Sequence, residues 1–334
     1  MPTQANNKTI RLENIFLHVT QSCNLSCSYC YFSAGRAMPN EMKTSDFASL
    51  WSDVVNLRPR KVIFTGGEPL LRKDIFQLLS SLKDADQQHV LKACLNTNGF
   101  FINKDIAQLL VGLVDEVRIS LDAMQRKNDD LRGERSFNVA VNALEQLYFA
   151  GFEPIVLITV TSHSLPDLEE LLSFLYRKNI TRIHINQFRA IGRGKVLAQM
   201  NVEANDVSAA IRNAWKRNFP NKDFPLNKAS SKTSLNCGIG KYLNIMPNGD
   251  VYPCHALMDK AFLCGNVLEQ SLTTICQHDK FLGRLSNIDF PQLSQQHQSL
   301  ETLAKKPTCM GQVYSETKHL PVWKHCLPNR ESSS

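Results

Sequence analysis

The feature that most limits the possible folds of this chain is an alternation of strand-like and helix-like segments. Short apolar runs typical of buried strands occur at about residues 15–19, 62–65, 90–95, 116–121, 155–160 and 182–188. Segments with a helical spacing of apolar residues occur at about 45–57, 74–82, 104–111, 137–150, 167–176 and 206–215. This alternation predicts an α/β fold of repeated βα units around a parallel sheet, and six such units form a partial, three-quarter barrel.

Polar residues follow the predicted strands at the end where such barrels carry their working groups. A cysteine-containing loop follows the first strand, and further candidates follow the next three strands: Gly66, Gly67, Glu68, Asn96, Asn98, Ser120 and Asp122. Because side chains alternate along a strand, Ser120 and Asp122 lie on the same face. The alternative for this last pair is a strand-end cap or turn, and the sequence does not decide between the two.

The cysteine-containing loop reads TQSCNLSCSYCY and places Cys23, Cys27 and Cys30 within eight residues. Three thiolates can hold three corners of a 4Fe–4S cluster and leave the fourth iron open to a ligand that is not protein. A zinc site is the alternative, but it needs a fourth tetrahedral ligand nearby. His18 precedes the motif inside an apolar run, where we expect its side chain to be packed.

The cysteine spacing, with the aromatic Tyr29 before the last cysteine, resembles the signature of the radical S-adenosylmethionine (SAM) superfamily. The resemblance implies that SAM chelates the open iron and is cleaved to a 5′-deoxyadenosyl radical that abstracts a substrate hydrogen. It also implies a partial barrel. The stretch KVIFTGGEPLLR resembles the family's GGE motif, in which Gly66 and Gly67 allow close backbone approach and Glu68 could accept hydrogen bonds from the ammonium group of SAM.

The same resemblance extends to other candidate SAM-binding residues, namely Tyr29, Asn98, Ser120, Asp122 and Arg193. Ser120 is similar to the family's ribose-contacting position. Arg189 or Arg193, in a stretch that resembles a G-R-G motif, could hold a carboxylate of SAM or substrate, or both could be solvated loop arginines. Arg132-Gly133 matches a recurrent family feature without a role that the sequence supplies. The sequence assigns no catalytic residue of its own.

The last hundred residues predict a second, smaller unit. We expect a barrel over residues 1–217, a Lys- and Ser-rich linker over 218–236 and a cysteine-rich domain over 237–334. A hairpin is predicted at 242–253, turning at Asn248-Gly249. This region resembles the SPASM/twitch extension, which implies one auxiliary 4Fe–4S cluster held by Cys237, Cys254, Cys309 and Cys326.

The remaining cysteines and the neighbouring histidines have weaker claims. Cys264 and Cys276 are left over but could replace one of the four predicted ligands. Cys94 lies within the third predicted strand and is expected in the core. His255 and His325 stand beside cluster cysteines and could be ligands, but we expect them to lie behind the ligands or at the surface.

Composition excludes several other classes of protein. No stretch of the 334 residues is apolar enough to span a membrane, and the polar N-terminus lacks the apolar core of a signal peptide. We therefore expect a cytoplasmic protein whose ten cysteines are metal ligands and core thiols rather than disulfides. The net charge of +7 is scattered along the chain, which argues against nucleic acid as a partner.

These observations predict a radical SAM enzyme that acts on a peptide made by the ribosome. The alternatives left open are radical modification of a small molecule such as a sugar, nucleoside or cofactor precursor, a non-catalytic iron–sulfur electron-transfer protein, and a zinc-stabilised structural or nucleic-acid-binding protein. The expected partners are an electron donor such as flavodoxin or ferredoxin and a separate peptide-recognition protein. The second is expected because only about fourteen residues precede the first predicted strand.

Overall fold

Nine strands form one continuous sheet in the computed structural model, which describes residues 12–221, 240–278 and 282. The strand order across the sheet is β6-β5-β4-β3-β2-β1-β7-β8-β9. All neighbours from β6 to β7 are parallel, whereas β8 is antiparallel to β7 and to β9. The strands are β1 Asn14–Thr20, β2 Lys61–Gly66, β3 Lys92–Thr97, β4 Glu116–Ser120, β5 Ile155–Val160, β6 Ile183–Gln187, β7 Tyr242–Ile245, β8 Asp250–Tyr252 and β9 Gly265–Asn266.

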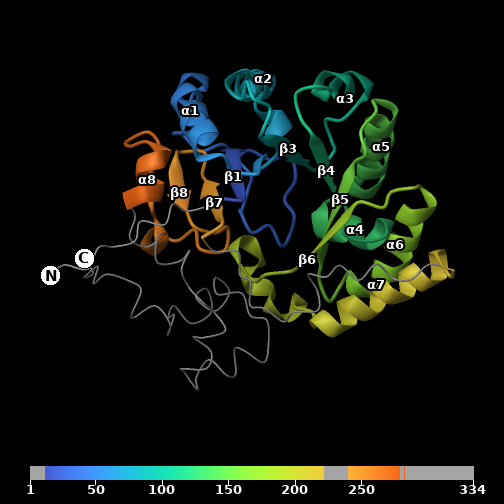
Figure 1. The fold of residues 1–334 in the computed structure, drawn as a ribbon. Helices are drawn as coiled ribbons and strands as arrows, with labels where there is room; N and C mark the ends of the chain where they lie inside the picture. Colours follow the sequence, from blue (N-terminus) through green and yellow to red (C-terminus); the bar gives the residue numbers. More distant parts are fainter. Residues whose placement is uncertain (1–11, 222–239, 279–281, 283–334) are drawn as a thin grey trace.

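Helices connect the parallel strands and cover one face of the sheet, as Figure 1 shows for the row α1, α2 and α3. The helices are α1 Phe47–Leu57, α2 Ile75–Ala85, α3 Lys104–Leu110, α4 Gln125–Arg132, α5 Ser136–Phe149, α6 Leu168–Arg177, α7 Ala204–Asn218 and α8 Leu272–His278. Short 3-10 segments occupy Thr44–Asp46, Pro69–Leu71, Leu165–Asp167, Gly192–Met200 and Lys260–Phe262. Because β6 and β9 are the two ends of the strand order, the barrel is partial, as predicted.

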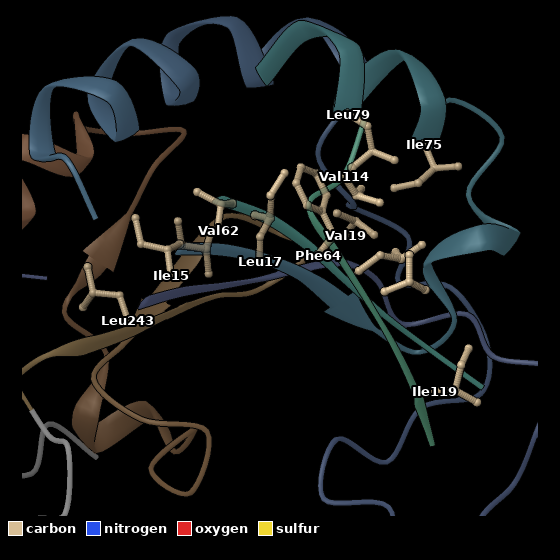
Figure 2. Close-up of a cluster of buried hydrophobic side chains, with 14 of the residues drawn as sticks. Ile15, Leu17, Val19, Val62, Phe64, Ile75, Leu79, Val114, Ile119 and Leu243 are labelled. Atoms are coloured by element: carbon tan, nitrogen blue, oxygen red, sulfur yellow. The ribbon is translucent and has the colours of Figure 1, made fainter. Parts of the chain in front are cut away.

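The core lies between the sheet and its helices and follows the alternation of side chains along each strand. Ile15, Leu17 and Val19 are fully buried on β1 and face the helices together with Phe64 of β2 and Leu79 of α2 (Figure 2). Complete burial of each such side chain contributes about 1.5–3 kcal/mol, so this layer fixes which face the helices cover. The intervening side chains therefore point to the opposite face, called here the inner face of the sheet.

The inner face is more polar than the helix-covered face. It carries His18, Asn96, Arg118 and Ser120 at alternate positions of β1, β3 and β4. On β5 the two faces differ in exposure, because Leu157 and Thr159 are half-exposed while Val156, Ile158 and Val160 are buried. The inner face of β5 is therefore partly exposed at Leu157 and Thr159, whereas Ile155 on the same face is buried.

The predicted strands and helices of the barrel agree with the structure, but one helix was missed. All six predicted barrel strands and their following helices are present, with end points that differ by a few residues. Helix α4 was not predicted, because its sequence QRKNDDLR lacks an apolar stripe and buries only Asn128 and Leu131. Helix α7 ends at Asn218, where the predicted linker starts.

The predicted hairpin is present as β7 and β8, with Gly249 at φ +87° in the turn, and it joins the sheet of the barrel. Strand β7 runs parallel to β1, with Phe16 opposite Asn244, and so extends the sheet of the barrel. Asp53 of α1 also accepts a hydrogen bond of 2.7 Å from the backbone N–H of Leu272, at the start of α8. The segment 240–278 therefore packs as a continuation of the barrel.

Among the helices in the described ranges, none has both the length and the apolar character needed to cross a bilayer.

Candidate functional site

The loop after β1 carries the three motif cysteines and is held in shape by its own backbone. The backbone N–H of Cys23 donates to the Gly35 carbonyl at 2.9 Å, and Gly35 donates to the Gln21 carbonyl at 2.9 Å. Glu41 closes the loop from the other side, because its Oε1 accepts from the Gln21 N–H at 2.8 Å and from the Met38 N–H at 3.0 Å. The three cysteines are half-buried within this closed loop, which we call the cysteine loop (residues 21–41).

Gly66 and Gly67 bring the end of β2 directly against the cysteine loop. A Cβ at Gly66, whose φ is +133°, would lie 2.4 Å from the Thr20 carbonyl oxygen, and a Cβ at Gly67 would lie 2.0 Å from the Ser22 carbonyl oxygen. Both distances are far below contact, so only glycine fits. The predicted close approach is present, but in this structure it is an approach to the cysteine loop.

Glu68 joins β2 to β3 and is completely buried. Its carboxylate accepts from Thr97 Oγ1 at 2.7 Å, from the Asn98 N–H at 2.8 Å and from the Leu70 N–H at 3.1 Å. Burial raises the pKa of Glu68, although these donors act in the opposite direction. Three protein donors therefore use the carboxylate that was predicted to bind the ammonium group of SAM, and that binding role stays a prediction.

Asn98 continues this connection to the cysteine loop. Its Nδ2 donates to Asn24 Oδ1 at 2.8 Å, and its Oδ1 accepts from the Phe100 N–H at 3.0 Å. The side chain is 7% exposed. Asn98 thus holds the loop that carries the motif cysteines, and its predicted contact with SAM stays a prediction.

Tyr29, Asp122 and Arg132 form a buried triad on the other side of the cysteine loop. Asp122 Oδ2 accepts a short hydrogen bond from the Tyr29 hydroxyl. It also forms an ion pair with Arg132 Nη1 at 2.9 Å, and the same Nη1 donates to the Tyr29 oxygen at 2.7 Å. Asp122 Oδ1 accepts from the Thr159 N–H at 2.7 Å. Burial raises the pKa of Tyr29 well above its usual value, so the hydroxyl keeps its proton.

The triad also gives a role to Arg132, which the sequence left without one. The Arg132 carbonyl accepts from Cys27 Sγ at 3.7 Å, and the Leu131 carbonyl accepts from the Ser28 N–H at 3.0 Å. The C-terminal end of α4 therefore holds the middle of the cysteine loop. Sequence reasoning missed this contact because it missed α4 itself.

Arg193 holds the same loop from a different element. Its Nε donates to the Cys27 carbonyl at 3.0 Å, its Nη1 to the Ala34 carbonyl at 2.5 Å, and its backbone N–H to the Cys30 carbonyl at 3.0 Å. Arg193 therefore lies against the cysteine loop. Carboxylate binding, its predicted role, stays a prediction.

Ser120 ends β4 on the inner face and is half-exposed. Among the described residues, its hydroxyl has no hydrogen-bond partner, in contrast to Glu68, Asn98 and Asp122. A free hydroxyl at the end of a barrel strand fits the predicted contact with a ribose. Arg189 is half-buried nearby, beyond the end of β6.

The second cysteine group is described only in part. Cys254, Cys264 and Cys276 are buried, whereas Cys237, Cys309, Cys326 and His325 lie outside the described residues. The predicted ligand set of the auxiliary cluster therefore stays a prediction.

His255, next to Cys254, contacts Tyr31, next to Cys30, with ring centroids 5.4 Å apart. Burial, together with the positive charge of Arg189, lowers the pKa of His255 to about 4. An uncharged imidazole ring thus connects the two cysteine-bearing regions.

The donor set of the cysteine loop fits an iron–sulfur cluster. Burial raises the pKa of Cys23 to about 11 and also raises that of Cys27, so iron must displace these protons to bind. In the described ranges, no group of three or more His, Cys, Asp or Glu side chains converges closely enough to hold a single metal ion. Because each cysteine of a 4Fe–4S cluster binds a different iron, the thiols need not converge on one point.

The opposite end of the barrel holds an ionic network that the sequence did not indicate. Glu116, the first residue of β4, pairs with Lys61 at 2.8 Å, with Arg118 at 2.7 Å and with Arg182 at 3.2 Å. Burial raises the pKa of Glu116, but the hydrogen bonds from Lys61 and Arg118 outweigh it and lower the value to about 2. The carboxylate is therefore ionised throughout the physiological range.

Comparison with known proteins agrees with both halves of the sequence interpretation. The family model described as Radical SAM superfamily matches residues 17–175, and that of an iron–sulfur cluster-binding domain, SPASM, matches residues 237–313. The chain is 32% identical to mycofactocin maturase MftC of Mycobacterium ulcerans over 265 residues, which cover 75% of this chain and 70% of that relative. It is 27% identical to Fe-coproporphyrin III synthase of Methanosarcina barkeri, covering 58% of this chain and 48% of that relative.

Solved structures share the fold. The AdoMet-bound structure of anSMEcpe has a TM-score of 0.66 at 18% identity, and the aligned region covers 81% of this chain and 82% of the anSMEcpe chain. Streptococcus suis SuiB bound to precursor peptide SuiA has a TM-score of 0.68 at 18% identity, and the aligned region covers 84% of this chain and 68% of the SuiB chain.

Proposed function

This chain belongs to the radical SAM superfamily and carries a SPASM iron–sulfur domain, and we propose that its substrate is a peptide made by the ribosome. The observation that carries the proposal is the 32% identity to a mycofactocin maturase, which extends over three quarters of the chain. Among proteins of the same fold, SuiB binds the precursor peptide SuiA and anSMEcpe binds a peptide designated Kp18Cys. The radical SAM chemistry itself follows from family membership.

The open edge of the sheet supports a peptide substrate. Within the described residues, β6 pairs only with β5, so one edge of Ile183–Gln187 offers unpaired backbone groups. An extended peptide can add to such an edge through main-chain hydrogen bonds. The neighbouring inner face of β5 is solvent-accessible, which gives the added peptide room for its side chains.

Different residues of the site hold the cluster and hold the cysteine loop. We propose that Cys23, Cys27 and Cys30 hold the SAM-binding cluster, while Gly66, Gly67 and the Tyr29–Asp122–Arg132 triad hold the loop that carries them. When bound, this cluster supplies the electron that cleaves SAM to the hydrogen-abstracting 5′-deoxyadenosyl radical.

Residues at the ends of the neighbouring strands contact SAM and the cysteine loop in this proposal. The Ser120 hydroxyl, which has no hydrogen-bond partner among the described residues, is offered to the ribose of SAM. Asn98 orients the near side of the cysteine loop through its hydrogen bond to Asn24. Burial of Glu68 and Asp122 beneath this site keeps water away from the ion pairs and hydrogen bonds that shape it.

Three further parts of the proposal concern the rest of the system. We propose one auxiliary 4Fe–4S cluster held by Cys237, Cys254, Cys309 and Cys326, an electron donor such as flavodoxin or ferredoxin, and a separate protein that presents the peptide. The SPASM match over residues 237–313 supports the auxiliary cluster. A cytoplasmic location fits the reducing conditions that such clusters require.

The test measures 5′-deoxyadenosine by mass spectrometry after anaerobic reconstitution, reduction and addition of SAM, with and without each short peptide encoded beside the gene. Product that rises with one peptide, together with a mass change in that peptide, supports the proposal. Product that no peptide stimulates would reject the peptide substrate in favour of a small molecule. Cys23→Ala is the control, because loss of one ligand should abolish SAM cleavage while far-ultraviolet circular dichroism stays unchanged.

A further inference from the structure

We propose that Arg193 raises the reduction potential of the cluster in the cysteine loop by placing an uncompensated positive charge beside it. The inference rests on the proposed ligation by Cys23, Cys27 and Cys30, and it assigns to Arg193 a role other than binding a carboxylate. Arg193 is a positioning and charge-bearing residue in this proposal, because its contacts are to the loop and not to the reacting atoms.

Arg193 contacts the loop at three points that span the motif. The guanidinium donates to the carbonyls of Cys27 and Ala34, and the backbone N–H donates to the carbonyl of Cys30. Two of these three acceptors belong to proposed cluster ligands. The charged group is therefore fixed against the backbone of the residues that would carry the cluster.

The neighbouring glycines keep Arg193 in this position. A Cβ at Gly192, whose φ is +57°, would lie 2.2 Å from the Tyr31 carbonyl oxygen and 2.5 Å from that of Cys30. A Cβ at Gly194 would lie 2.8 Å from the ring of Phe188. The segment can approach the loop this closely only because both flanking residues lack side chains.

The two arginines that hold the cysteine loop differ in charge balance. Arg132 is paired with the Asp122 carboxylate at 2.9 Å, so its charge is neutralised locally. The hydrogen-bond acceptors of the Arg193 guanidinium are carbonyl groups, and within the described ranges no carboxylate forms an ion pair with it. Arg193 is also half-buried, which limits screening by water. Its positive charge therefore acts on the cysteine loop without an ion-paired carboxylate among the described residues.

The expected effect follows from the charge of the cluster. A 4Fe–4S cluster with three thiolate ligands is anionic, and reduction adds one electron from the external donor without forming a bond. Net charge and hydrogen bonding near such a cluster set its potential. A fixed cation stabilises the more negative, reduced state, so its removal should make the cluster harder to reduce.

The test compares charged and neutral side chains at position 193. Midpoint potentials are measured by electron paramagnetic resonance during redox titration without SAM, together with iron content and SAM affinity, for wild type, Arg193→Lys and Arg193→Gln. Arg193→Gln should show about a tenfold lower ratio of reduced to oxidised cluster at a fixed potential, equivalent to about 59 mV for one electron. Arg193→Lys should stay close to wild type in potential.

A second pair keeps the test decisive where Arg193→Gln loses its cluster. Lysine and N6-acetyl-lysine at position 193 have similar length and both donate a hydrogen bond, but only lysine is charged. A lower potential for the acetylated protein supports the proposal. Equal potentials for Arg193→Lys and Arg193→Gln, or for the lysine and acetyl-lysine proteins, would overturn the proposal. Equal potentials together with weakened SAM binding would assign Arg193 to the carboxylate of SAM instead.

Discussion

The two ends of the barrel use the same chemistry for different purposes. At the end where the parallel strands begin, called here the closed end, the Glu116 carboxylate binds Lys61, Arg118 and Arg182, which lie on strands or directly before one. At the end where the strands finish, called here the open end, the Asp122 carboxylate binds Tyr29 and Arg132, which lie in the cysteine loop and at the end of α4. The first network connects β2, β4 and β6, whereas the second fixes a loop. Ionic contacts therefore stabilise the sheet at one end and shape the site at the other.

The closed-end network should give the largest change when broken. Glu116→Gln leaves three cations around a neutral amide, and removal of one partner from a largely buried ion pair costs about 3 kcal/mol in the free energy of unfolding. Denaturant unfolding followed by circular dichroism measures this loss. SAM cleavage per folded protein should be unchanged, and a large fall in it would contradict the separation of the two ends.

The same network predicts a dependence of stability on pH. The pKa of Glu116 in the folded protein is lowered from 4.5 to about 2, so its contribution is fully present above about pH 4.5 and is lost as the pH falls toward 2. The stability difference between wild type and Glu116→Gln should therefore shrink as the pH is lowered from 6 to 3. A constant difference over this range would show that Glu116 is not the titrating group.

The open-end network should give a smaller, functional change. Tyr29→Phe removes the hydroxyl that bridges Asp122 and Arg132 but leaves their ion pair intact. Outer contacts of this kind typically contribute about tenfold or more to metal affinity or activity, so we expect about a tenfold fall in SAM cleavage or iron retention. Iron content after gel filtration and the initial rate of 5′-deoxyadenosine formation report this change. Unaltered values in both would show that the triad does not position the loop.

Breaking a surface ion pair should give the smallest loss in the free energy of unfolding. Glu145→Gln is the same chemical change as Glu116→Gln, but its partner Lys178 lies 2.8 Å away at an exposed site. We expect a loss below about 0.5 kcal/mol and no change in iron content or activity. A loss as large as that of Glu116→Gln would mean that burial does not explain the difference between the two ion pairs.

The sequence predicted the elements of the fold better than the contacts of the site. Apolar periodicity located six strands because each buries a face, and the cysteine and Gly-Gly-Glu motifs placed the site at the correct end of the barrel. It missed α4, whose polar sequence carries no periodic signal, and therefore could not connect Arg132 with Tyr29 and Asp122. It also gave no sign that a Cβ at Gly67 would meet the Ser22 carbonyl, and the predicted contact of Gly67 with SAM stays a prediction. Motifs identify which residues gather, but long-range contacts decide what each one touches.

The pairing of β7 with β1 also has a consequence for how the chain folds. Strand β1 has β2 on one side, which follows closely in the sequence, but its other neighbour begins only at Tyr242. During synthesis at about 5–20 residues per second, one edge of β1 stays unpaired for on the order of ten seconds or more. An unpaired apolar strand edge is prone to intermolecular pairing. The barrel of this protein is thus completed late, by a strand from the domain that follows it.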